Sequence, residues 1–199
     1  MATQSSVHVY LNWAKERLDE MDATLASFES KVGQLRGDVR AKAESTLADM
    51  RARGDAFRET IKKEREANEA AWARVKAALE ADWNAFEASV QKYIDTAGEQ
   101  IGQQEAAFRA SAEAQLKAWQ GAIDEFQTSA KGFAADRKAD VESALKRMKV
   151  EAETAKAKLA GLNRAGNESW SALKTGLAET RAAFDRTNQA VNDAFKRAG

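Results

Sequence analysis

WARVKAALEADWNAFEASVQKYIDTAGEQI, residues 72–101, carries its large apolar side chains at a regular spacing. They form three interleaved series with a step of eleven residues: Trp72, Trp83 and Ile94; Val75, Phe86 and Ala97; Leu79, Val90 and Ile101. Eleven residues fill about three turns of an α-helix. The three series therefore predict one apolar stripe along a helix, and such a stripe is buried against another helix or against a membrane surface.

The same spacing returns later in the chain, at Phe108, Trp119, Ala130, Val141 and Ala152. Before residue 62, apolar side chains three and four residues apart also predict a core-facing helix. The chain contains no proline, the residue that most strongly interrupts helices. We therefore predict an all-α protein of long amphipathic helices with a hendecad and heptad stripe, arranged as an antiparallel hairpin or an elongated coiled-coil bundle.

Glycines indicate where these helices end. In GLNRAGNES, residues 161–169, a glycine can end one helix and Asn167 or Ser169 can cap the next. A second glycine pair lies in residues 96–104, although the stripe continues in register to Ile101 and an uninterrupted helix fits almost as well. The predicted organisation is a flexible N-terminus over 1–5, a long helical coiled-coil region over 6–160, a turn over 161–168 and a C-terminal helix over 169–197.

Residue types that perform chemistry are scarce. The chain has no cysteine and a single histidine, His8, which argues against zinc sites and against the paired histidines of di-iron bundles. Gly161 and Gly166 have the spacing of a phosphate-binding loop, but Asn167 and Glu168 follow where that loop needs lysine and serine or threonine. We predict no enzyme activity, no catalytic residues, no cofactor and no metal.

Charge and hydropathy restrict the partners and the location. Lysine and arginine number 31 and aspartate and glutamate 31, so the formal net charge is zero. Nucleic-acid binding needs a basic surface, so a nucleic-acid partner is not expected. The longest apolar run is Ala70 to Ala73, whereas a membrane-spanning helix needs about 20 apolar residues. We expect a cytoplasmic protein that is soluble or peripheral to a membrane.

The apolar stripe suggests what the protein does. We expect a structural or scaffolding protein that forms a homo-oligomer, or binds another coiled-coil protein, by burying the stripe. The residues predicted to carry this self-association are Trp72, Val75, Leu79, Trp83, Phe86, Val90, Ile94, Ile101, Phe108 and Trp119. Asn188 and Gln104 occupy stripe positions where an apolar residue is expected. A polar residue in such a position can set helix register or oligomeric state.

Two segments, KERLDEMDATLASFESKVGQL (15–35) and ESWSALKTGLAETRAAFDRTNQAVNDAFKRAG (168–199), resemble uncharacterised helical proteins of alphaproteobacteria. The eleven-residue periodicity also resembles that of apolipoproteins and lipid-droplet coat proteins. That resemblance implies an alternative function, in which the protein binds a membrane or lipid surface peripherally. First contact is then expected over 131–164, where nine basic residues outnumber five acidic ones. The prolines that often separate repeats in those families are missing here, which favours helix pairing.

Overall fold

The computed structural model describes residues 3–64, 69–165 and 169–198, and these residues form long α-helices with no strand among them. The six α-helices are α1 (Thr3–Val32), α2 (Gly37–Lys63), α3 (Glu69–Tyr93), α4 (Gln103–Ala130), α5 (Ala135–Arg164) and α6 (Trp170–Ala198). Between α3 and α4 lie a π-helical turn, η1 (Ile94–Gly98), and a 3-10 turn, η2 (Glu99–Ile101). The prediction of an all-α fold is confirmed.

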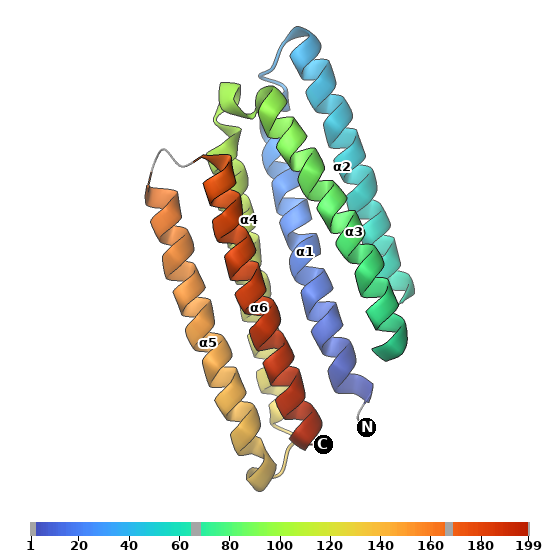
Figure 1. Ribbon diagram of the computed structural model, residues 1–199, viewed down its shortest axis with the longest axis vertical. Helices are drawn as coiled ribbons and strands as arrows, with labels where there is room; N and C mark the ends of the chain where they lie inside the picture. Colours follow the sequence, from blue (N-terminus) through green and yellow to red (C-terminus); the bar gives the residue numbers. More distant parts are fainter. Residues whose placement is uncertain (1–2, 65–68, 166–168, 199) are drawn as a thin grey trace.

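The helices form an elongated bundle in which each helix runs antiparallel to the next (Figure 1). α1 is central and contacts α2, α3, α4 and α6, whereas α2 and α5 lie at opposite edges. We call α1–α3 the N-terminal half and α4–α6 the C-terminal half. The link between the two halves is residues 94–102, at the top of the bundle in Figure 1.

Two clusters of buried apolar side chains form the core. The first lies mainly among α1, α2 and α3, where the rings of Phe28 and Tyr93 stack with centroids 4.0 Å apart. It continues into the C-terminal half through Phe108, Trp170 and other side chains near the link. The second cluster lies among α4, α5 and α6, where the ring of Trp119 meets the edge of Phe184. The two halves therefore share apolar contacts close to the link.

The helical region predicted over 6–160 is divided into five helices, α1–α5. Gly37, at the start of α2, and Gly102, directly before α4, adopt left-handed φ values of 58° and 61°, which interrupt a right-handed helix and which glycine accepts at little cost. Between α4 and α5, Ala134 is extended with ψ of 152°. The apolar spacing continues in register across these turns, so periodicity alone did not reveal them.

The ends of the chain also differ slightly from expectation. Residues 3–5, predicted to be flexible, belong to the first turn of α1. Of the turn predicted over 161–168, residues 161–164 continue α5, and 166–168 lie outside the described residues. α6 begins at Trp170, and the hydroxyl oxygen of Ser169 accepts a hydrogen bond from the backbone N–H of Ala172 at 3.3 Å. Ser169 thus caps α6, as the sequence allowed.

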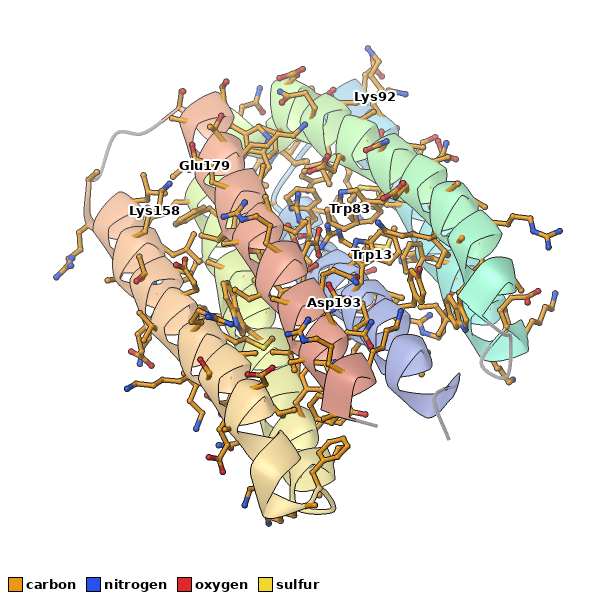
Figure 2. All side chains as sticks on the ribbon, turned by 60° about the horizontal axis from the view of Figure 1, so that its bottom comes forward. Trp13, Trp83, Lys92, Lys158, Glu179 and Asp193 are labelled. Atoms are coloured by element: carbon orange, nitrogen blue, oxygen red, sulfur yellow. The ribbon has the colours of Figure 1, made fainter. Side chains whose placement is uncertain are left out.

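Charged side chains cover the outside of the bundle. In Figure 2, Lys158 of α5 and Glu179 of α6 point toward one another, and they form an ion pair. Among the described residues, the one large apolar side chain that is exposed is Val150, at 59%. None of the helices in the described ranges combines the length and the hydropathy that crossing a membrane requires. The apolar faces of the amphipathic helices are therefore turned inward.

Candidate functional site

A row of polar side chains is buried where the central helix α1 packs against α4 and α6. We call this row the polar seam: Asn12, Glu16, Arg17, Glu20 and Thr24 on α1, Ser111 and Gln115 on α4, and Thr180, Arg181, Asp185, Asn188 and Asn192 on α6. Asp185 is half-buried and the others are buried. Most of its α1 members are four residues apart and therefore lie on one face of the helix. Arginine and glutamate are almost never fully buried unless they are paired. The two buried arginines of the seam are accordingly held in ion pairs.

Arg181 lies at the centre of the polar seam. Its Nη2 and Nε atoms donate to the two carboxylate oxygens of Glu20, at 2.7 and 3.2 Å. Such two-pronged pairing is the strong geometry for a guanidinium and a carboxylate. Its Nη1 atom lies 3.6 Å from Oε1 of Glu87 on α3, and its guanidinium carbon lies 4.6 Å from the ring centroid of Trp83. Arg181 therefore joins α6 to both α1 and α3.

Arg17 is the second cation of the polar seam. Its Nη2 atom donates to Oδ2 of Asp185 at 2.9 Å, and its Nη1 atom pairs with the carboxylate of Glu16. The guanidinium carbon lies 5.1 Å from the ring of Trp13 and 5.8 Å from that of Trp83. Both tryptophans lie near the middle of the bundle (Figure 2). Because aromatic faces attract cations, the two rings stabilise the buried guanidinium groups.

Hydrogen bonds from uncharged side chains extend the polar seam in both directions. Gln115 donates through Nε2 to Glu20 at 3.0 Å and accepts at Oε1 from the hydroxyl of Thr180 at 2.6 Å. The hydroxyl oxygens of Thr24 and Ser111 are 2.7 Å apart. Specific polar contacts therefore bind α1 to α4 as well as to α6.

Some buried polar atoms of the seam have no hydrogen-bond partner within the described part of the protein. They are Nδ2 of Asn12, Oε1 of Glu16, and the Oδ1 atoms of Asp185, Asn188 and Asn192. Asn188 is satisfied on its other side, where Nδ2 donates to the carbonyl oxygen of Val9 at 2.9 Å. A buried polar atom without a partner costs about 1–3 kcal/mol. These atoms lower the stability of the interface between the two halves, while its hydrogen bonds and ion pairs make it specific.

Negative charge exceeds positive charge in this region. Glu16, Glu20, Glu87 and Asp185 face the guanidinium groups of Arg17 and Arg181. Burial raises the pKa of Glu16 to about 7; the attraction of Arg17 opposes this shift and the repulsion of Glu20 adds to it. Burial lowers the pKa of Arg181, but the carboxylates of Glu20 and Glu16 outweigh burial and raise it. Glu16 is thus the group of the seam that titrates near neutral pH.

The space beside the polar seam is small. A cavity of about 20 Å³ lies between Glu20, Glu87, Arg181, Trp83 and neighbouring side chains. This volume is close to that needed for one water molecule, whereas sites for organic ligands measure about 300–1,000 Å³. Within the described residues, no three histidine, aspartate or glutamate side chains are grouped as a metal site. The arrangement is suited to holding helices in register.

The predicted self-association stripe lies inside the bundle. Trp72, Leu79, Trp83, Phe86, Val90, Ile94, Phe108 and Trp119 are buried, and Val75 and Ile101 are partly buried. The ring of Trp72, for example, stacks on that of Tyr10 in α1. The helices that cover the stripe belong to the same chain, so a second copy reaches these side chains only if the bundle rearranges. The stripe is thus buried against helices, as its pattern predicts, and its role in self-association stays a prediction.

The sequence patterns pointed to one member of the polar seam, Asn188, and missed the others. Gln104, the other polar stripe residue, is half-buried at the start of α4 and lies outside the seam. The side chain of His8 is not among those described. The spacing of Asn12, Glu16, Glu20 and Thr24 was available as a signal, but polar residues four apart are also typical of a solvated helix face.

No family model, no curated protein and no solved structure matches this chain. The function must therefore be inferred from the residues and their arrangement alone.

Proposed function

We propose that the protein is a non-enzymatic structural protein that self-associates, with the polar seam as the element that directs association. The observation that carries this proposal is the bidentate pair between Glu20 and Arg181, together with its neighbours, at the interface of the two halves. Buried polar pairs specify which helices pair and in which register, because a misaligned partner leaves charges unpaired.

Each copy of the chain carries both sides of this interface. The α1 side presents Arg17 and Glu20, and the α6 side presents Asp185 and Arg181. The α1 of one copy therefore matches the α6 of another copy as well as it matches its own. The apolar stripe adds the burial energy once helices of different copies pack together. The small cavity beside the seam supports a role in assembly over a role in catalysis.

The test is the mass of the full-length protein as a function of concentration, by analytical ultracentrifugation. One chain has a mass of 21.8 kDa, and we expect the measured mass to rise above it with concentration. Arg181→Lys keeps the charge but loses the two-pronged geometry, and we expect it to weaken association. Arg58→Lys, at the exposed pair with Asp22, is the matched control and leaves association unchanged. A single-chain mass at every concentration would contradict the proposal.

A second candidate function, peripheral binding to a membrane or lipid-droplet surface, is favoured by one feature of α5. The exposed Val150 lies on this edge helix among Lys146, Arg147 and Lys149. Basic residues precede Val150, whereas Glu151 and Glu153 follow it. The basic side suits an anionic lipid surface, to which each lysine or arginine contributes about 1 kcal/mol. Both functions fit a cytoplasmic protein, which in the second case lies at a membrane.

Flotation with vesicles tests this second candidate. We expect co-flotation with phosphatidylserine-containing vesicles at low salt, and its loss in the variant Lys146→Glu/Lys149→Glu. Lys42→Glu/Lys62→Glu changes the net charge equally on α2, at the opposite edge, and serves as the control. Equal loss in both variants would indicate unspecific attraction, and no flotation of the wild type would eliminate lipid binding at these compositions.

A further inference from the structure

We infer that two copies of this protein exchange halves: the N-terminal half of each copy packs on the C-terminal half of the other through the polar seam, and α3 and α4 join into one continuous helix. This inference rests on the proposed self-association and specifies its partner, a second copy, and its geometry.

The link between the halves is already almost entirely helical. Ile94–Gly98 forms a π-helical turn and Glu99–Ile101 a 3-10 turn, and Gly98 has ordinary helical angles, with φ of −63° and ψ of −40°. Gly102 departs from this geometry, with φ of 61° and ψ of 31°. Rotation at Gly102, with regularisation of the two short turns, converts the link into α-helix.

The two glycines of the link, Gly98 and Gly102, are needed for the turn between α3 and α4. A Cβ atom at Gly98 would lie 3.0 Å from Cγ2 of Ile94, closer than side chains normally approach. In a regular α-helix, an alanine four residues after an isoleucine is accommodated without conflict. At Gly102 the surrounding space is open, but the left-handed φ is unfavourable for any other residue. A straight helix needs neither glycine, since glycine weakens helices.

The apolar pattern also passes through the link without interruption. Val75, Phe86, Ala97, Phe108 and Trp119 are successively eleven residues apart, on both sides of residues 94–102. On a continuous helix this spacing places all of them on one face. The spacing continues across the turn between α4 and α5 as well, but there Ala134 is extended, with ψ of 152°. Conversion to a continuous helix is therefore easiest at the link.

If the N-terminal and C-terminal halves of one copy separate, the contacts that they lose must be replaced by a partner. Opening the bundle uncovers the ion pairs of Glu20 and Arg181 and also the apolar side chains Phe108, Trp170 and Leu177, which belong to the first apolar cluster. A second copy restores each of these contacts with identical residues. Exchange of identical elements is a route to dimers that needs little new interface, because the contacts of the closed form are remade.

The pair Thr24 and Ser111 offers a direct test. Their hydroxyl oxygens are 2.7 Å apart across the seam, one in each half, and the chain has no cysteine of its own. The variants Thr24→Cys and Ser111→Cys are mixed in equal amounts, unfolded, refolded together at high concentration and oxidised. Because each chain then has one cysteine, this disulfide joins two copies, and in the folded seam it requires Thr24→Cys of one copy to lie beside Ser111→Cys of the other. We expect a covalent dimer on a non-reducing gel, well above the amount from either variant alone.

Glycine substitutions test the link independently. In Gly98→Ala/Gly102→Ala the closed turn is strained and the continuous helix is not, so we expect the dimeric fraction to rise by about fivefold or more. Gly37→Ala introduces the same left-handed conflict in open space at another turn. It is the matched control, and we expect no comparable rise. Light scattering gives the mass, and circular dichroism verifies that each variant is folded.

The outcomes separate this inference from the proposed function. A disulfide in the mixture, with a dimer favoured by the link variant, supports exchange. Self-association without a disulfide in the mixture, while Thr24→Cys/Ser111→Cys closes within one chain, overturns exchange and leaves self-association standing. If the double variant fails to close, an unchanged mass in the link variant overturns exchange. A single-chain mass throughout overturns both.

Discussion

Arg181 on α6 holds both carboxylate oxygens of Glu20 on α1, at 2.7 and 3.2 Å, although 161 positions separate the two residues in the chain. Both side chains are buried. This two-pronged ion pair joins the N-terminal and C-terminal halves. Its surroundings lead to predictions that can be checked on the full-length protein.

Breaking this pair from one side should be costly. Glu20→Ala leaves the Arg181 charge buried without its main partner, and we expect the free energy of unfolding to fall by about 3–5 kcal/mol. Glu20→Met/Arg181→Met removes both charges and should recover much of that loss. Urea denaturation gives both values. The control is Asp22→Ala at the exposed pair with Arg58, for which we expect a loss of about 1 kcal/mol or less.

Glu16 should make stability depend on pH near neutrality. The charged groups that act on it are Arg17 and Glu20 on α1 and Arg181 and Asp185 on α6. Its pKa rises from 4.5 in the unfolded chain to about 7 in the fold, so the folded protein binds the proton more tightly. The resulting stabilisation is complete below pH 4.5 and disappears as the pH rises through about 7.

Glu16→Gln mimics the protonated carboxyl at all pH values. Compared with the wild type, we expect this variant to be more stable above pH 7, by up to about 3 kcal/mol, and to lose the decline between pH 5 and 7. Thermal or urea unfolding at several pH values measures this difference. The exposed Glu113→Gln should retain the wild-type pH profile; a parallel profile for Glu16→Gln would show that Glu16 is not responsible.

Asn188→Leu should stabilise the bundle. The Oδ1 atom of Asn188 is buried without a partner, and the residue lies on α6 between Phe184 and Val191, which belong to the second apolar cluster. Leucine removes the unpartnered atom but also the hydrogen bond from Nδ2 to Val9, and we expect a net gain of about 1 kcal/mol or less in unfolding free energy. We also expect a less uniform oligomeric state, because a polar residue that fixes register is lost. A single unchanged species in sedimentation would contradict the second expectation.

Trp83 should contribute more through its ring face than Trp119 does. Arg181 lies over the ring of Trp83 and Arg17 lies near it, whereas Trp119 meets the edge of Phe184 and has no cation over its ring among the described residues. Replacing either by phenylalanine removes similar volume. Because tryptophan attracts cations best, we expect Trp83→Phe to lose about 0.5–2 kcal/mol more than Trp119→Phe in urea denaturation. Equal losses would mean that the cations add nothing.

The sequence predicts the helical class and the buried stripe because a 3.6-residue period reports which side of a helix leaves water. It does not report which helix covers that side. Trp72 and Phe86 were therefore placed correctly on an apolar face, while the covering helices turned out to belong to the same chain. For residues 96–104 the sequence allows either a helix end or an uninterrupted helix, because the stripe stays in register through Gly102.

The polar seam could not be predicted for a different reason. α1 is central and therefore buried on more than one face, so Asn12, Glu16 and Glu20 are as inaccessible as Met21 and Phe28. In the sequence, this second face looks like a solvated one. A buried polar face is distinguished from a solvated one only by the packing of α6 against α1, and these helices lie far apart in the chain.

The indole rings beside Arg17 and Arg181 give the bundle a natural optical reporter. Indole emission responds to nearby charge, and Trp13 and Trp83 are the tryptophans with a guanidinium over the ring in the described residues. All five tryptophans belong to the apolar clusters, and of these guanidinium contacts only the one between Arg181 and Trp83 joins the two halves. If the two halves separate, Trp83 loses the guanidinium of Arg181, and we expect its emission to report that separation without a dye or label.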